Sequence, residues 1–380
     1  MFSAGFRPFF LLAGLWSALA VPVWLVAYSA GVVIPSAFPP LVWHVHEMVF
    51  GFALASVTGF LLTAIPNWTG RLPLRGAPLA ALALLWLAGR TAVLLSSLTG
   101  PAAAAFIDLA FPAVLIAVVA RELVAGRNWR NLPMIVALSL LFAGSLLVHL
   151  HALGLAYTAE TGNRLGIATL LMLIALVGGR IVPSFTRNWL ARVRPQGALP
   201  APSGRIDVAA LALTFAGLAS WVAAPQAAAT SWLTGAAGIA LALRLSRWCG
   251  LATLREPLLL VLHAGYAWLA LGLLLLGING LHPLLPPTAA LHALTIGAVG
   301  TMTLAVMTRA TLGHSGQPLV AGPGTVAIYL LVTLAALLRL AVPLGGDYLL
   351  HLTWCAGAAW SSAYLLFFFA YFGALTRTAP

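Results

Sequence analysis

Long apolar runs, broken at intervals by Pro, Gly and Arg, follow one another along the whole chain of 380 residues. Runs of about twenty apolar residues can cross the hydrocarbon core of a bilayer as helices. The runs are continuous rather than alternating in polarity, which excludes a transmembrane β-barrel. The pattern predicts an all-α polytopic membrane protein with about twelve spans, at residues 8–33, 41–65, 76–98, 101–120, 133–154, 164–184, 206–224, 230–246, 257–279, 287–309, 323–343 and 349–373.

Composition supports a membrane protein and excludes two other classes. The chain is 62% hydrophobic and only 7% charged, whereas a soluble domain carries about a quarter of its residues charged. The first apolar run is too long for a cleavable signal peptide, and further spans follow it. The formal net charge of +12 comes mostly from short loops, where membrane topology explains it without a nucleic-acid partner. We therefore expect one transmembrane domain over residues 1–380, in contact with lipid.

Basic residues gather in alternate loops. They precede span 1 and follow spans 2, 4, 6, 8, 10 and 12, while the opposite loops hold little more than Arg164 beside Glu160, and Asp347. The positive-inside rule then predicts that both termini lie in the cytoplasm. The arginines that define this pattern are Arg7, Arg71, Arg75, Arg121, Arg127, Arg130, Arg187, Arg192, Arg194, Arg205, Arg244, Arg247, Arg255, Arg309 and Arg377.

The chain also shows signs of an internal repeat. Similar segments, "FRPFFLL", "WRNLPMIV" and "LREPLLLV", open spans 1, 5 and 9 at nearly even intervals. The next span of each group closes in a basic turn: "AIPNWTGR", "RIVPSFTRNW" and "AVMTRATLG". Three units of four helices, at residues 1–125, 126–250 and 251–380, would produce this period.

Most histidines fall in the predicted outer half of the membrane or at its surface. A lone interfacial histidine is usually solvated by headgroups or bonded to a carbonyl, but a group of them suggests ligation, because imidazole is the commonest metal and haem-iron ligand. Two pairs, 44/46 and 149/151, are each spaced by about 200° on a helix, so both members cannot face one point. The candidate metal ligands are His44, His46, His149, His151, His292 and His351.

Four charged residues lie at a similar predicted depth. Arg90, Asp108 and Arg339 fall in the outer halves of spans 3, 4 and 11, and an intramembrane arginine requires a partner. Arg90 could pair with Asp108, or Arg90 and Arg339 could bind haem propionates, for which the forked guanidinium is suited. Glu47 could orient a histidine ring, relay a proton or accept a hydrogen bond from a neighbouring span, and Asp108 is a second candidate for orienting a ligand or relaying a proton.

Several long motifs resemble those of the NnrS family. They are "FRPFFLL", "WHVHEMVFGFALASVTGFLLTAIPNWTGR", "GGRIVPSFTRNWL" and "LHALTIGAVGTMTLAVMTRATLGHSGQPL", and the resemblance covers the whole chain. It implies a bacterial inner-membrane protein that binds haem and copper and is associated with nitric oxide exposure and denitrification. The resemblance carries no residue-level ligand map, so the histidine assignments rest on depth and chemistry.

The architecture is also similar to the catalytic subunit of haem–copper oxidases, where spans 2 and 10 clamp a haem. By this analogy His44 or His46 would ligate haem with His292, and His149, His151 and His351 would be the copper candidates. The chain departs from that pattern, because span 10 holds one histidine and span 6 holds none. We expect a membrane protein of nitric oxide detoxification or nitrosative stress, and one hypothesis is that it reduces nitric oxide with electrons from an unidentified donor. A transporter or channel for a metal, haem or nitrosylated iron species, and a non-catalytic haem-based nitric oxide binder, remain the alternatives.

Overall fold

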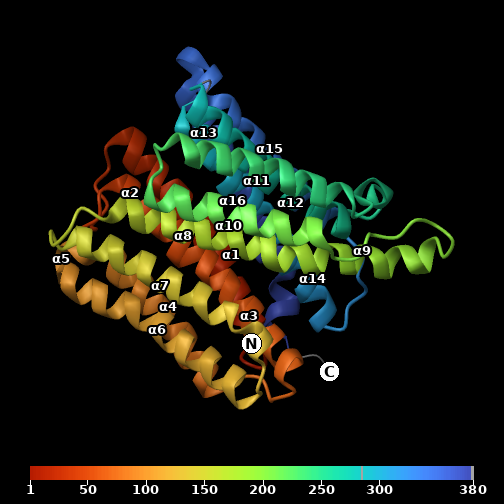
Figure 1. Cartoon of the computed structure of the whole chain (residues 1–380). Helices are drawn as coiled ribbons and strands as arrows, with labels where there is room; N and C mark the ends of the chain where they lie inside the picture. Colours follow the sequence, from red (N-terminus) through yellow and green to blue (C-terminus); the bar gives the residue numbers. More distant parts are fainter. Residues whose placement is uncertain (284–285, 378–380) are drawn as a thin grey trace. The chain divides into compact units, whose positions relative to one another are not determined.

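The computed structural model describes residues 1–283 and 286–377, and this part of the chain is built from helices without strands (Figure 1). Twelve helical segments are long and apolar enough to cross a membrane. The elements are α1 (Phe6–Ala30), α2 (Pro40–His46), η1 (Glu47–Ala53), α3 (Leu54–Thr69), α4 (Ala77–Leu94), α5 (Ser96–Thr99), α6 (Pro101–Ala125), η2 (Trp129–Asn131), α7 (Pro133–Ala152), α8 (Ala159–Leu173), η3 (Ile174–Gly178), α9 (Gly179–Val193), α10 (Arg205–Ala223), α11 (Ala228–Ser246), η4 (Gly250–Thr253), α12 (Pro257–Leu281), α13 (Pro287–His292), η5 (Ala293–Gly300), α14 (Thr301–His314), α15 (Pro323–Ala341), η6 (Val342–Leu344), η7 (Gly346–Tyr348) and α16 (Leu349–Thr376).

Each predicted span corresponds to one of the twelve segments, with differences at the ends. The third span divides, because α4 ends at Leu94 and the short helix α5 follows as a separate turn. The sixth span continues to Val193 instead of ending near residue 184. Arginine is a good helix former, so the basic residues Arg187 and Arg192 extend the helix beyond its apolar part rather than ending it.

The described chain divides into two compact units. The first comprises Met1–Thr169, Met307–Pro318 and residues 364–377, and the second comprises Leu170–Val306, apart from residues 284–285, and Leu319–Ala363. The predicted division into three repeats is a statement about sequence and remains a prediction.

In the first unit, α6 lies beside α3, α4 and α7, and α1 packs against α3 and η1 (Figure 1). Large aromatic side chains fill the space between these helices. The rings of Phe9 on α1 and Phe111 on α6 lie 5.8 Å apart, and Trp86 of α4 is 1% exposed. This core holds α4, α6 and α7 in fixed positions around the start of η1.

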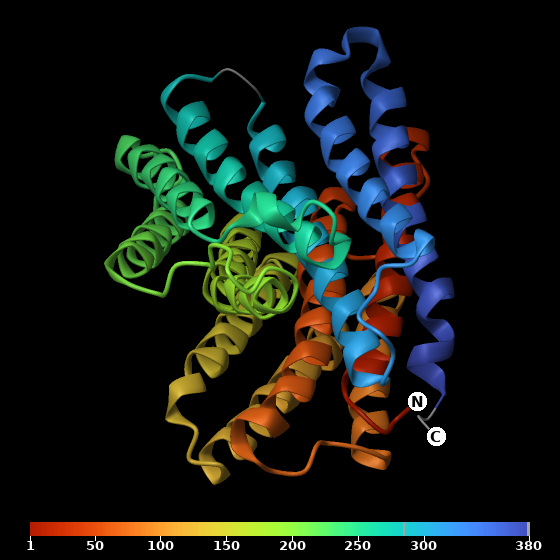
Figure 2. The ribbon, with the colours of Figure 1, turned by 90° about the vertical axis from the view of Figure 1, so that its right-hand side faces the viewer.

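In the second unit, α11 lies between α10 and α12, and Figure 2 shows α10 and α11 side by side. Small residues permit the close packing of α11 on α12. A Cβ atom at Gly277 of α12 would lie 2.5 Å from the backbone nitrogen of Gly235 on α11. Close backbone approach at small residues is a usual way for membrane helices to associate.

Three of the long segments contain a π-helical stretch. These stretches are η1, η3 and η5, and they interrupt the second, sixth and tenth spans. The three stretches fall in the second span of each predicted repeat, and the repeat itself remains a prediction. A π-helix leaves some backbone carbonyls without their usual partners and is often found at a functional site. Here Trp86 donates its indole N–H to the carbonyl of Gly51 in η1, at 3.1 Å.

Candidate metal centre

A closed polar cluster lies inside the first unit, where α2, η1, α4, α6 and α7 meet. His46 is the last residue of α2 and Glu47 the first residue of η1. Arg90 comes from α4, Asp108 from α6 and His149 from α7. All five side chains are buried, with 0% to 3% of their surface exposed. Residues from four predicted spans thus meet in one place that water does not reach.

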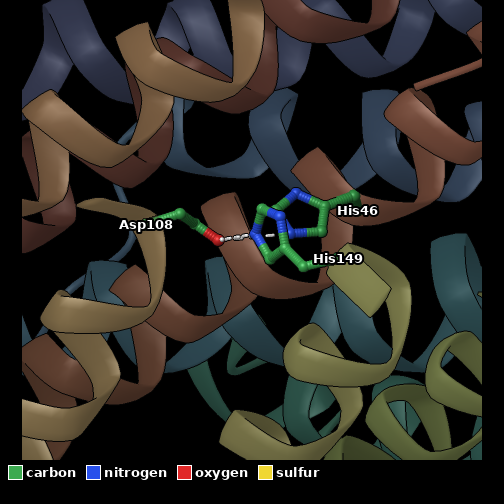
Figure 3. Close-up of side chains that lie close together, drawn as sticks. All are labelled: His46, Asp108 and His149. Carbon is green, nitrogen blue, oxygen red and sulfur yellow. Dashed lines mark hydrogen bonds and ion pairs between the residues drawn. The ribbon is translucent and has the colours of Figure 1, made fainter. Parts of the chain in front are cut away.

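Two histidines and one aspartate form the centre of the cluster (Figure 3). One oxygen of Asp108, Oδ2, lies 2.9 Å from Nε2 of His149 and 3.3 Å from Nε2 of His46. One ligand atom from each of these three residues lies within 4.8 Å of the other two. The second nitrogen of His46, Nδ1, lies 3.1 Å from Oε1 of Glu47. The two imidazoles therefore converge on one carboxylate, and Glu47 fixes the orientation of the His46 ring.

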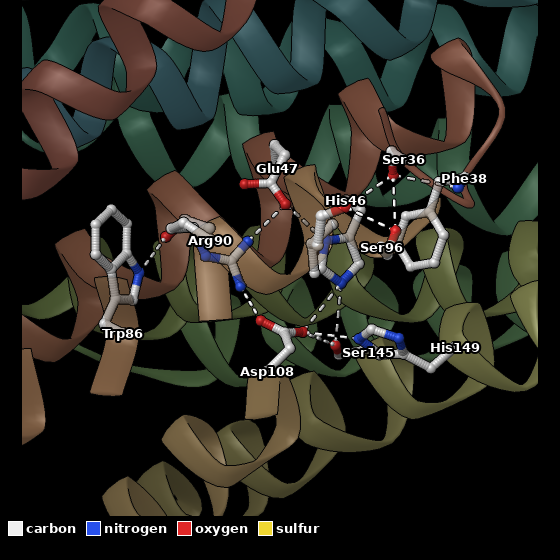
Figure 4. Close-up of polar contacts among 12 residues, drawn as sticks. Ser36, Phe38, His46, Glu47, Trp86, Arg90, Ser96, Asp108, Ser145 and His149 are labelled. Carbon is white, nitrogen blue, oxygen red and sulfur yellow. Dashed lines mark hydrogen bonds and ion pairs between the residues drawn. The ribbon is translucent and has the colours of Figure 1, made fainter. Parts of the chain in front are cut away.

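Arg90 connects the two carboxylates of the cluster (Figure 4). Its Nη1 donates to Oε1 of Glu47 at 2.7 Å, and its Nη2 donates to Oδ1 of Asp108. The predicted pair of Arg90 with Asp108 is thus present, and Glu47 is a second partner. Ser145 of α7 adds a hydroxyl that donates to Oδ2 of Asp108 at 3.3 Å and lies 3.2 Å from Nε2 of His46.

The formal charges of the cluster do not balance when both histidines are neutral. Glu47 and Asp108 bring two negative charges, and Arg90 brings one positive charge. An uncompensated charge is costly in a buried site at membrane depth. One more positive charge would balance the cluster, either as a proton shared with an imidazole or as a bound metal cation.

Each predicted histidine pair contributes one member to the cluster. The other member of the first pair, His44, stacks its ring on the indole of Trp24, with centroids 4.3 Å apart. The other member of the second pair, His151, lies with its ring 6.1 Å from that of Tyr157. The cluster therefore takes His46 and His149, and the metal-binding role predicted for His44 and His151 has no counterpart in it.

The remaining predicted ligands belong to the second unit. Nδ1 of His292, the last residue of α13, lies 2.6 Å from the carbonyl oxygen of Thr288. A carbonyl oxygen can only accept, so Nδ1 is the donor in this hydrogen bond. His351 is exposed, and its ring lies 6.1 Å from the ring of Tyr348. Arg339 lies near the end of α15 and is partly buried. The haem clamp predicted for the histidines of spans 2 and 10, and the propionate role of Arg90 and Arg339, stay predictions.

A second polar cluster, in the second unit, was not predicted. Arg244, which the sequence pattern places among the basic residues at the end of span 8, lies inside α11 and is 3% exposed. It donates to Asp207 of α10 at 2.8 Å, to the carbonyl of Ala175 in η3 at 2.8 Å, and to the hydroxyl of Tyr266 at 2.9 Å. Its position within the helix agrees with the predicted range 230–246, but its contacts with an aspartate and a π-helix carbonyl were not predicted. Among the described contacts of Arg244, Asp207 is the one side chain that commonly ligates a metal. We therefore interpret this cluster as a structural link between helices.

Sequence reasoning also missed Ser145, Phe38 and the pair Ser36 and Ser96, which lie around the buried histidine–carboxylate cluster. Ser145 lies on α7 one turn before His149, so helical spacing could have found it. The other three lie in or beside the connection between α1 and α2, and nothing in their local pattern indicates contact with a histidine.

Comparison with known proteins agrees with the resemblance read from the motifs. A search of curated proteins gives no match. The model of the NnrS protein family matches residues 1–378, essentially the whole chain. The match extends over nearly the whole of a chain whose described helices are suited to cross a membrane. The chain therefore belongs to the NnrS family.

Proposed function

We propose that this NnrS-family protein acts in nitric oxide detoxification or in the response to nitrosative stress, through a metal ion held by His46, His149 and Asp108. Family membership fits a membrane protein of the nitric oxide response. The observation that carries the metal site is the convergence of two imidazole nitrogens on one carboxylate oxygen inside a buried cluster. We also propose that the protein lies in the bacterial inner membrane, as the family resemblance implies, with both termini in the cytoplasm, as the arginine pattern indicates.

The spacing of the donor atoms fits a single ion. Ligands that are each about 2.0–2.1 Å from one metal lie roughly 3 Å apart. The separations of 3.3 Å and 2.9 Å between the histidine nitrogens and Asp108 Oδ2 are of this size. A bound cation would also offset the one negative charge that Glu47, Asp108 and Arg90 leave uncompensated, in full if the ion is singly charged. Nitrogen and carboxylate donors suit copper, zinc and iron, and copper is the candidate that the family resemblance implies.

The same residues do not fit haem. The ring centroids of His46 and His149 are only 5.3 Å apart, and Phe38 and Phe50 pack against the His46 ring at 5.1 Å and 5.2 Å. A macrocycle between these imidazoles would have to displace both phenyl rings. A haem, which the resemblance also implies, would therefore need a histidine outside the cluster. His292 is the candidate, because its bond to Thr288 directs Nε2 away from that carbonyl.

The chain's own residues would prepare the site for a metal in three ways. Glu47 accepts from Nδ1 of His46, which leaves Nε2 as the ligating nitrogen and holds the ring in place. Arg90 fixes both carboxylates, so that Asp108 presents Oδ2 to the imidazoles. The apolar ring of Phe38 packs against both imidazoles and keeps water away from them. When bound, copper would supply a place where nitric oxide binds and exchanges electrons.

Copper content and nitric oxide binding test the proposal directly. We expect the purified protein to contain about one copper ion per chain at this site, and His149→Ala to lose it, because removal of one ligand weakens a three-ligand site strongly. His151→Ala is the matched control, since it removes the same side chain two residues further along the same helix. Copper would be counted by mass spectrometry and its ligands identified by electron paramagnetic resonance. Equal copper loss in both variants, or a wild-type protein without copper, would refute the proposed site.

A transporter for a metal or a nitrosylated iron species is the second candidate function. It is favoured by the π-helical interruptions of spans 2, 6 and 10, because transporters often bind their substrates where membrane helices are interrupted. Consumption of nitric oxide by the reduced protein would support an oxidoreductase. Copper uptake into proteoliposomes without such consumption would support transport, and nitric oxide binding with neither activity would support a non-catalytic binder.

A further inference from the structure

One phenyl ring covers both histidines of the metal cluster. Phe38 lies in the connection between α1 and α2, and its ring centroid is 5.1 Å from that of His46 and 5.3 Å from that of His149 (Figure 4). Phe38 is 4% exposed, whereas the next residue, Pro39, is exposed and the preceding Ala37 is partly buried. The ring therefore stands between the buried imidazoles and a stretch of chain at the surface of the protein.

Two serines hold the backbone that carries this ring. The hydroxyl of Ser36 lies 3.2 Å from the hydroxyl of Ser96. The Ser36 hydroxyl also donates to the carbonyl of Val93 at 2.9 Å. The hydroxyl of Ser96 accepts from the backbone N–H of Ala37 at 2.8 Å, and that of Ser36 accepts from the N–H of Phe38 at 3.2 Å. These contacts attach the connection, directly before Phe38, to the end of α4 and the start of α5.

We propose that Phe38 determines which ligands reach the metal cluster: its ring excludes hydrated and anionic molecules and admits a small uncharged diatomic. The inference rests on the proposed function, because it requires a metal ion at His46 and His149. An anion would have to lose its hydration shell to pass an apolar side chain, and this loss is costly. A diatomic such as nitric oxide has little hydration to lose. Apolar residues around a metal site control solvent access in this way.

The chain offers a matched control on the other side of the same imidazole. Phe50 packs against His46 with a centroid distance of 5.2 Å and is 2% exposed. Its ring is enclosed by close backbone, since a Cβ atom at Gly144 would lie 3.0 Å, and one at Gly166 2.7 Å, from Cζ of Phe50. Phe50→Ala thus removes the same atoms beside His46 as Phe38→Ala, without opening the cluster toward the connection between α1 and α2.

The experiment compares azide and nitric oxide as ligands of the copper-loaded protein. Azide is the anionic probe, and stopped-flow absorption follows its binding to wild type, Phe38→Ala and Phe50→Ala in detergent. We expect Phe38→Ala to bind azide on the order of tenfold faster than wild type. Phe50→Ala should stay within about twofold of wild type, and nitric oxide should bind all three at rates that differ by less than about threefold. Equal azide rates for the two alanine variants would overturn the inference.

Two further measurements keep the result decisive. Should Phe38→Ala not retain copper, Phe38→Leu replaces it: faster azide binding than wild type supports the inference, and an unchanged rate overturns it. Ser96→Ala keeps the ring but removes its backbone anchor, so we expect a smaller acceleration in the same direction. Failure of the inference would leave copper content and nitric oxide binding intact. A wild type without copper at His46 and His149 would instead refute the proposed function before azide is added.

Discussion

Arg90 is the residue whose removal should most destabilise the first unit. Arg90→Met leaves two buried carboxylates, Glu47 and Asp108, without the guanidinium that bonds to both. Breaking a buried ion pair by removing one partner costs about 3–5 kcal/mol. Glu47 is 0% exposed and Asp108 2% exposed, so water cannot replace the lost bonds, and the upper part of this range is expected. Whole domains are stable by only about 5–15 kcal/mol, so the loss should be conspicuous.

The assay is unfolding of the metal-depleted protein in detergent, followed by tryptophan fluorescence. Arg164→Met is the control, because Arg164 also pairs with a glutamate, Glu160, at 3.3 Å, but the Glu160 side chain is 90% exposed. An exposed pair contributes about 0–1 kcal/mol, so this variant should unfold nearly like wild type. The triple variant Arg90→Met, Glu47→Gln, Asp108→Asn should recover much of the stability, since no buried charge is left without its partner.

The comparison between the two arginines decides whether the charge argument is correct. If Arg90→Met and Arg164→Met differed by less than about 1 kcal/mol, the carboxylates of the cluster could not depend on the guanidinium. The cluster would then carry its protons on Glu47 or Asp108, and the need for an additional cation, which supports the metal proposal, would disappear.

Two other predictions separate the metal cluster from the rest of the molecule. Gly51→Ala should lower the free energy of unfolding by about 1–3 kcal/mol and lower the copper content. The added Cβ would lie 2.9 Å from Nη1 of Arg90, 3.0 Å from Oε2 of Glu47 and 3.1 Å from Nε1 of Trp16. Gly373→Ala is the control, because nothing lies within 4 Å of its added atom, and it should leave the melting temperature and the copper content nearly unchanged. Arg244→Met should lower the melting temperature, since it breaks the link between Asp207, Tyr266 and η3. The copper content should stay at the wild-type value. Copper loss in this variant would contradict the assignment of the metal site to the first unit alone.

The number and approximate positions of the helices follow from hydropathy because a bilayer demands long apolar segments. Their ends do not follow so well. Span 6 continues through Arg187 and Arg192 to Val193, since a helix outside the hydrocarbon core needs no apolar side chains. Arg244 shows a different limit, because the sequence places it near a helix end but gives no sign that it is buried and bonded to Asp207.

The sequence predicts that histidines and carboxylates form the site, but it does not predict which histidine of each pair belongs to it. Helical spacing excluded a common direction for His44 and His46, and likewise for His149 and His151, without choosing between them. The choice depends on neighbours that are distant in sequence: Trp24 stacks on His44, whereas Asp108 and Ser145 contact His46. Hydropathy contains no information about such contacts, so both members of each pair had to remain candidates.

The π-helices explain why adjacent residues can serve one cluster. In an α-helix, successive side chains point about 100° apart, yet His46 and Glu47 both lie fully buried in the same polar group. The start of η1 at Glu47 widens the helical turn there and reduces this angle.

At the corresponding place in span 6, η3 follows Leu173 and begins with Ile174, neither of which can ligate a metal. There Arg244 bonds to the π-helix carbonyl of Ala175, as Trp86 bonds to that of Gly51. Both π-helices thus offer a backbone carbonyl to a side chain from another helix. Only the first begins beside a histidine and a glutamate, which join the polar cluster.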